Sequence, residues 1–417
     1  MRAPDAGSGR AAVAVLFLVN VLNFCDRLVL GALAEPVRRE FALSDAGLGA
    51  LVTLFTICYA LAGLPLGRWA DRGSRKKLLL VAVAAWSALT ALGAAAVGFV
   101  SLLATRLGVG VAQAACAPAA TSWLGDAVPA GRRSRAMAVF MMGVPVGSML
   151  SFAVAGPVAQ AWGWRAALLV TALPAVALVP ALALLREPVR EPAPGVGTSA
   201  WSLLRVPAFR WIIVSGALVN FALYAFSTFL PAFLARVHSL TVGEAGVWSG
   251  LGAGAAGVAG GLLAGAWGDR AAQGAPGGRL RAAALVSLAA APAALAGVSA
   301  GGAAGALGGL MLAYALLSAY YGLVYAAIQD LVAPTLRASA MAIYFLAMYL
   351  CGASFGPLVT GRLSDALARR AAGAGALTEA ARAVGLQQAM YVMPLGAVLL
   401  AASLWMGSRR AESAAHP

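Results

Sequence analysis

Charged residues are scarce in this sequence. They make up 11% of its 417 residues, whereas soluble globular domains carry roughly 25%. So few charges cannot cover a surface that faces water, and the 61% hydrophobic content indicates a membrane protein with several spans. The net charge of +15 then needs no nucleic acid as a partner, because Lys and Arg concentrate in the cytoplasmic loops of membrane proteins.

Motifs for nucleotides and metals are also missing. The chain has no Walker sequence and no cluster of His and Cys, and its four cysteines (Cys25, Cys58, Cys116 and Cys351) all lie in apolar runs. The stretch GAGAAG at 252–257 fits G-x-G-x-x-G but lies in an apolar run with no strand before it, so we interpret it as helix-packing glycine. We therefore expect no metal, no cofactor and no enzymatic activity. Any work that the protein does is coupled to an ion gradient, or is not coupled to an energy source at all.

Twelve apolar runs are long enough to cross a bilayer as helices. They lie at 11–33, 47–69, 78–99, 101–124, 136–160, 165–185, 209–235, 246–267, 280–298, 304–329, 338–361 and 384–406. A polar segment rich in Pro and Gly separates the sixth run from the seventh. We predict a six-helix bundle at 1–185, a cytoplasmic linker at 186–208 and a second six-helix bundle at 209–417.

The distribution of Lys and Arg predicts the orientation. The loops that share a side with the N-terminus carry most of them, so we expect both termini to be cytoplasmic and the protein to lie in the inner membrane. One loop on the other side, 362–383, departs from this bias with Arg362, Arg369, Arg370 and Arg382. We expect a short interfacial helix there.

Two segments of the first half recur in the second. GLPLGRWADR at 63–72 matches GLLAGAWGDR at 261–270, and DAVPAGRRSRAMAVF at 126–140 matches DLVAPTLRASAMAIY at 330–344. Each pair occupies equivalent positions in its half, which indicates a duplication with parallel repeats. The sequence thus predicts an all-α membrane protein of twelve transmembrane helices in two pseudo-symmetric bundles. This is the plan of major facilitator transporters, in which substrate binds near the membrane midplane between the halves.

The repeated loop motif predicts a cytoplasmic gate. Glycines four residues apart allow close helix packing, and an acid at the membrane edge can bind the partly positive N-terminus of a helix in the other half. We expect Asp71 to face a helix start near Ala338, and Asp269 one near Ser134. Alternatively, the cations after the acid fix topology and contact lipid headgroups. The proposed gating residues are Gly63, Gly67, Asp71, Arg72, Arg75, Asp269 and Arg270.

The first apolar run holds four polar residues on one face. At 100° per residue, Asn20, Asn23, Asp26 and Arg27 lie within an arc of roughly 120°. Because ionised groups facing lipid are costly, these side chains must point into the protein, where they are candidates for function. The alternative is a structural Asp26–Arg27 pair.

The fourth run carries Arg106 and Gln113 on a shared face. Arg106 lies too deep in the membrane span for its guanidinium to reach the membrane surface, so we expect it to bind an anion. Gln113 could bind a substrate headgroup or the first helix.

Polar and aromatic residues recur in the second half. Asn220, Tyr224 and Ser227 share one face of the seventh run, and Tyr321 and Tyr325 share a face of the tenth with Tyr314 and Ser318. Such a stripe is often packing, but phenol hydroxyls in an apolar medium need partners, which favours a cavity wall.

With these motifs in place, the chain resembles the Spinster branch of the major facilitator superfamily, in its bacterial form. The resemblance is carried by the Asn-aromatic-x-Asp-Arg pattern at residues 23–27, by TRLGVGVAQAACAPAATSWLGD at 105–126 and by YAFSTFLPAFLARVHSLTVGEAG at 224–246. It implies a monomeric alternating-access transporter in contact with membrane lipids. Its expected substrate is an amphiphilic, anionic small molecule such as a lysophospholipid or sphingoid phosphate, which is exported or moved by facilitation.

The sequence departs from the Spinster pattern at one position. The family usually has Gly-Glu-Ala in the fourth helix, where the Glu is a proposed proton carrier, and this chain has Ala-Gln-Ala at 112–114. Because Gln113 cannot titrate, we expect weak or absent proton coupling, with Asp26 as the remaining carrier. Two alternatives stay open: a multidrug or organic-anion proton-linked transporter of the same fold, and a receptor or scaffold that transports nothing.

Overall fold

The computed structural model describes residues 6–188, 200–272, 277–332 and 336–415 of the chain. Within these ranges the regular secondary structure is entirely helical. The described chain falls into two compact units, which are treated separately below.

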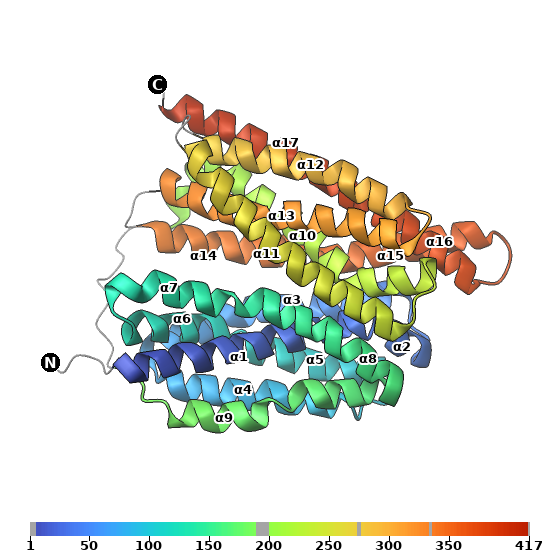
Figure 1. Cartoon of the computed structure of the whole chain (residues 1–417), viewed down its shortest axis with the longest axis horizontal. Coiled ribbons are helices and arrows are strands. Elements are labelled where there is room, and N and C mark those ends of the chain that lie inside the picture. Colours follow the sequence, from blue (N-terminus) through green and yellow to red (C-terminus); the bar gives the residue numbers. More distant parts are fainter. Residues whose placement is uncertain (1–5, 189–199, 273–276, 333–335, 416–417) are drawn as a thin grey trace. The chain divides into compact units, whose positions relative to one another are not determined.

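The helices of the first half of the sequence follow one another with short connections (Figure 1). They are α1 (Ala6–Ala32), α2 (Ala34–Glu40), α3 (Asp45–Arg72), α4 (Arg75–Gly93), α5 (Phe99–Gln113), α6 (Cys116–Ala127), α7 (Ala130–Met141), α8 (Gly143–Ala172) and α9 (Ala175–Leu184).

The second half begins with a short 3₁₀ turn at Ala200–Arg205. It continues with α10 (Pro207–Val237), α11 (Val242–Ala272), α12 (Gly278–Ser299), α13 (Ala303–Leu331), α14 (Arg337–Ala347), a π-helical turn η3 (Met348–Ala353), α15 (Phe355–Ala372), α16 (Glu379–Met390) and α17 (Val392–Ala415).

The described helices account for the twelve expected spans. Eleven segments are long and apolar enough to cross a membrane, and one of them, Ala136–Leu184, is 49 residues long and contains two of the expected spans. Gly163 separates these two, because its φ of +84° interrupts the helical backbone of α8 and is readily adopted only by glycine. The all-helical, twelve-span prediction is confirmed.

The helix ends follow local sequence signals. Ser74 caps α4 by accepting from the Lys77 amide, and Pro207 opens α10 at a position where its missing N–H is not needed. The prediction of a separate interfacial helix within 362–383 is wrong. Instead α15 runs on to Ala372, and α16 begins at Glu379.

Each compact unit includes a segment from the other half of the sequence. Unit 1 is Met1–Leu43, Leu54–Pro194 and Thr241–Leu251, and unit 2 is Ser44–Thr53, Gly195–Leu240 and Gly252–Pro417. The start of α3 therefore packs in unit 2 and the start of α11 packs in unit 1. The predicted bundle boundaries at 185 and 209 are drawn along the chain rather than by contacts, and they stay a prediction.

Candidate functional site

A buried ion pair lies at the centre of the polar face of α1, within unit 1. The Asp26 carboxylate accepts from Arg106 Nη1 on α5 at 3.1 Å and from Thr90 Oγ1 on α4 at 2.6 Å, and both charged side chains are almost completely buried. Leaving one member of such a pair without its partner typically costs about 3–5 kcal/mol. Asp26, Arg106 and Thr90 therefore bind three helices together.

Arg27 takes a different environment from its neighbour Asp26. Its guanidinium carbon lies 3.9 Å from the ring centre of Tyr59, 4.9 Å from that of Phe24 and 5.8 Å from that of Phe55. Arginine over aromatic faces gains cation–π stabilisation. Successive helix positions point about 100° apart, so an Asp26–Arg27 pair on one helix is disfavoured. The structure pairs Asp26 with Arg106, and the structural Asp26–Arg27 pair stays an untested alternative.

Two amides extend the polar face of α1. Gln113 Nε2 donates to the Asn23 carbonyl oxygen at 3.3 Å, so the expected bond between Gln113 and the first helix is present. The Gln113 Oε1 and Asn23 Nδ2 atoms are buried and have no hydrogen-bond partner among the described residues. Asn20 Nδ2 donates to the Phe140 carbonyl at the end of α7, 2.8 Å away. The inward orientation predicted for Asn20, Asn23 and Asp26 is confirmed by their burial.

In unit 2, the predicted residues of α10 and α13 approach one another. The Tyr321 hydroxyl donates to Asn220 Oδ1 at 3.2 Å, and Asn220 Nδ2 donates back to the Gly216 carbonyl of its own helix. Tyr325 packs against Tyr321 with ring centres 5.7 Å apart. The polar and aromatic residues predicted on α10 and α13 therefore form hydrogen bonds as well as packing contacts.

The remaining predicted residues of α10 show fewer polar contacts. Tyr224 packs edge-on against Tyr349 of η3, with ring centres 6.3 Å apart. Ser227 is half-buried on α10. Their role in substrate binding stays a prediction.

Sequence reasoning missed a second group of hydroxyls beside this stripe. Tyr320 is fully buried and its hydroxyl lies 2.7 Å from Ser215 Oγ and 2.9 Å from the Tyr344 hydroxyl. Tyr344 also packs edge-on against Tyr325. Tyr320 lies one residue before the predicted face of α13, and Tyr344 ends the repeated segment 330–344, so only the double tyrosine at 320–321 could have indicated the group.

The loop motif is partly described. A methyl group added to Gly63 or Gly67 would meet no described atom within 4 Å, so the close helix approach expected at these glycines is not found. The side chains of Asp71 and Asp269 lie outside the described residues. Arg72 and Arg270 are exposed. The cytoplasmic gate assigned to this motif stays a prediction.

The alternative in which Arg75 contacts lipid headgroups is wrong. Its side chain is 1% exposed and forms ion pairs with Asp126 and with Glu187, the latter at 3.3 Å. Burial raises the pKa of Glu187, but hydrogen bonds from Ser74, Arg75 and the Lys76 amide together outweigh burial, so the net shift of this pKa is downward. Arg75 is thus a structural cation of unit 1.

An equivalent ion pair occurs in unit 2. Arg279, near the start of α12, pairs with Asp330 at the end of α13. Asp126 and Asp330 occupy matching positions in the repeated segments, so the duplication seen in the sequence extends to their arginine partners.

Comparisons with known proteins agree on one family. The sequence model of the Major Facilitator Superfamily matches residues 16–357. An "MFS-type efflux pump" of Mycolicibacterium smegmatis is 35% identical over 86% of this chain and 85% of its own length. "Protein spinster homolog 1" of Homo sapiens is 32% identical, but this chain spans only 46% of its length.

Solved structures give the same fold. The crystal structure of a bacterial homolog to the human lysosomal transporter Spinster, in an inward-facing and unoccupied conformation, superposes with a TM-score of 0.88 at 27% identity. That match covers 97% of this chain and 98% of the other. A D-xylose–proton symporter, at 16% identity and a TM-score of 0.75, shows the fold alone.

Proposed function

This chain belongs to the Major Facilitator Superfamily, and we propose that it transports an amphiphilic, anionic, lipid-like small molecule such as a lysophospholipid or a sphingoid phosphate. It is a multi-pass membrane protein and a secondary transporter related to Spinster. The observation that carries the proposal on substrate is the position of Arg27, a cation set among three aromatic rings of α1 and α3.

Charge and apolar surface occur together at Arg27. The two oxygens of Asp26 are occupied by Arg106 and Thr90, so the negative charge of α1 is directed toward α5 and α4. An anionic headgroup would bind the Arg27 guanidinium, while Phe24, Phe55 and Tyr59 would contact the apolar portion next to the headgroup. In this assignment Arg106 acts by holding Asp26.

The side-chain amides near the Asp26–Arg106 pair support a substrate with a polar headgroup. Gln113 Oε1 and Asn23 Nδ2 are buried without partners in the described chain, and an unsatisfied buried polar atom costs about 1–3 kcal/mol. A headgroup with both donors and acceptors would satisfy them. In unit 2 we propose, as a separate assignment, that Asn220, Tyr224, Ser227, Tyr321 and Tyr325 also bind substrate.

Coupling follows from the same residues. Gln113 does not titrate, and Asp26 is held by a cation and a hydroxyl. We propose a facilitator or exporter whose transport depends weakly on a proton gradient. We further propose an inner-membrane monomer with cytoplasmic termini, in which Asp71 and Asp269 close the cytoplasmic side.

A binding assay on the purified protein tests the proposal. Titration with lysophosphatidylglycerol should show binding that Arg27→Ala weakens by roughly ten- to a hundredfold, since hydrogen bonds to charged groups contribute about 1.5–3 kcal/mol. Arg132→Ala removes an exposed arginine of α7 and should leave the affinity unchanged. Equal affinity of the native protein and Arg27→Ala would refute the role of Arg27.

The same panel addresses the second candidate function. The likeness to an "MFS-type efflux pump" of Mycolicibacterium smegmatis supports efflux as the second candidate, so a cationic amphiphile and a neutral monoacylglycerol are included. Preference for the cation would favour multidrug efflux. In proteoliposomes, accumulation of the anionic lipid under an imposed pH difference, with loss of that accumulation in Asp26→Asn, would contradict weak coupling.

A further inference from the structure

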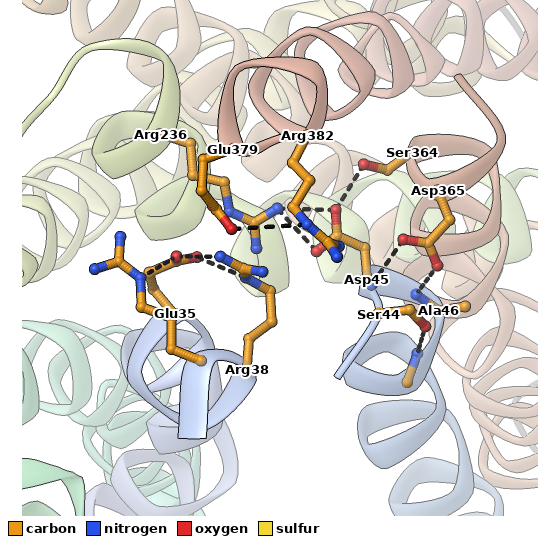
Figure 2. Close-up of polar contacts among 12 residues, drawn as sticks. Glu35, Arg38, Ser44, Asp45, Ala46, Arg236, Ser364, Asp365, Glu379 and Arg382 are labelled. Carbon is orange, nitrogen blue, oxygen red and sulfur yellow. Dashed lines mark hydrogen bonds and ion pairs between the residues drawn. The ribbon is translucent and has the colours of Figure 1, made fainter. Parts of the chain in front are cut away.

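The start of α3 is capped by a residue far away in the sequence, within unit 2. Asp365 Oδ1 accepts from the Asp45 amide at 3.0 Å and Asp365 Oδ2 from the Ala46 amide at 2.9 Å (Figure 2). These amides are among the N–H groups that a helix leaves unpaired at its first turn. A carboxylate at this position also interacts favourably with the helix dipole. Asp365 therefore holds the N-terminal end of α3 by charge as well as by hydrogen bonds.

An ion pair lies next to this cap. A carboxylate oxygen of Asp45 is 2.9 Å from Arg236 Nη1 at the end of α10, and their side chains are 3% and 2% exposed. Ser364 Oγ donates to the same carboxylate at 2.6 Å (Figure 2). Asp45 thus connects α3 to α10 and α15 through its side chain, while its amide is held by Asp365.

The next two turns of α3 pack closely along α15. A methyl group added to Gly49 would lie 2.4 Å from the Pro357 carbonyl oxygen, and one added to Gly361 would lie 2.2 Å from the carbonyl of Asp45. Further along, Thr53 Oγ1 donates to the Ser354 carbonyl, beside the π-helical turn. The first part of α3 is therefore held at three places: at the cap by Asp365, at Gly49 and at Thr53.

We propose that Asp365 and the Asp45–Arg236 pair form a latch that holds the start of α3 in unit 2. Ser44–Thr53 belong to the first repeat by sequence, whereas Asp365 and Arg236 belong to the second. Alternating access separates the repeats on one side of the membrane at a time. The latch releases when the transporter opens on the side where α3 begins, which is the non-cytoplasmic side in the predicted orientation. This inference rests on the proposed function as a transporter, but not on its substrate.

Distances between spin labels test the latch. Labels at Val97 and Gly301, two exposed loop positions, are measured by double electron–electron resonance after the four native cysteines are replaced. Asp365→Asn keeps the size of the side chain and removes its charge. It should raise the population with longer distances by roughly five- to tenfold, and Arg236→Gln should act in the same direction.

Two further variants make the result specific. Asp330→Asn removes an acid of the same half that pairs with Arg279, and it should leave the Val97–Gly301 distances unchanged. Ser364→Ala loses a single bond to Asp45 and should give a smaller shift, which provides a test if Asp365→Asn does not fold. Unchanged distances in folded Asp365→Asn or in Ser364→Ala would overturn the latch. A shift in a protein that binds no lysolipid would uphold the latch and refute only the proposed substrate.

Discussion

The start of α3 in unit 2 and the start of α11 in unit 1 pack in corresponding ways. Along α11, a methyl group added to Gly250 would lie 2.5 Å from a carbonyl oxygen of α8, and one added to Gly156 of α8 would lie 2.9 Å from the Gly246 Cα. At the helix end, Gln160 Oε1 accepts from the Gly243 amide at 2.7 Å. Glycine contacts along the helix and a side-chain cap at its start are thus common to both.

The two contacts differ in charge. Unit 2 uses the Asp365 carboxylate and a buried Asp45–Arg236 pair, whereas unit 1 uses the neutral amide of Gln160. The nearby ion pair of unit 1, between Glu40 and Arg165, is exposed at 41% and 42%. Exposed pairs are worth about 0–1 kcal/mol, while leaving a buried charge unpaired costs about 3–5 kcal/mol. The glycine packing is therefore common to both contacts, whereas the contact at the start of α3 depends far more on charge than the contact at the start of α11.

The glycines give the largest expected effect, and it should be similar in both units. Gly49→Ala places a methyl group against backbone that cannot move aside, which costs about 1–3 kcal/mol. Hydrogen exchange of the amides of residues 46–53 should accelerate by roughly five- to a hundredfold. Gly250→Ala should do the same at the start of α11. Gly63→Ala, on α3 but in open space, serves as the control, and equal exchange in Gly49→Ala and Gly63→Ala would refute the close packing.

The caps should give an intermediate effect that distinguishes the units. Asp365→Ala leaves two helix amides without their partner and removes a charge, whereas Gln160→Ala removes one neutral acceptor, and losing a cap costs about 0.5–2 kcal/mol. We expect exchange at the Gly243 amide to rise by roughly two- to tenfold in Gln160→Ala, and exchange at the Ala46 amide to rise more in Asp365→Ala. Equal increases would mean that charge adds nothing in unit 2.

Glu40 gives the smallest effect. The Trp164 indole N–H donates to its carboxylate at 2.6 Å and Arg165 adds a second bond, which together lower the pKa of Glu40 below its usual value. A carboxyl with a lowered pKa stabilises the folded state above its unfolded pKa of about 4.3, and this contribution is lost as the pH falls through the folded pKa. Because Glu40 is exposed, the contribution should be a few tenths of a kcal/mol.

Thermal unfolding between pH 6 and 3.5 measures this contribution. The native protein should lose slightly more stability than Glu40→Gln over that range, and the two curves should converge at the acidic end. A Glu40→Gln variant that loses more stability than the native protein would contradict the assigned sign.

The sequence by itself determined the helical spans, the duplication and the inward face of α1. Apolar runs of spanning length can only be helical in lipid, because every backbone polar group needs an internal partner there. The helical repeat places Asn20, Asn23 and Asp26 on one face, and lipid excludes that face. These properties depend on neighbouring residues and on the solvent, so the sequence is sufficient to predict them.

Tertiary structure decided which polar groups meet. Asp26 pairs with Arg106, 80 positions away on another helix. Arg75 is buried against Asp126 and Glu187 instead of facing lipid. Asp365 caps a helix that begins 320 residues earlier. Each of these contacts depends on how helices distant in sequence pack together, which hydropathy and periodicity along a single helix do not specify.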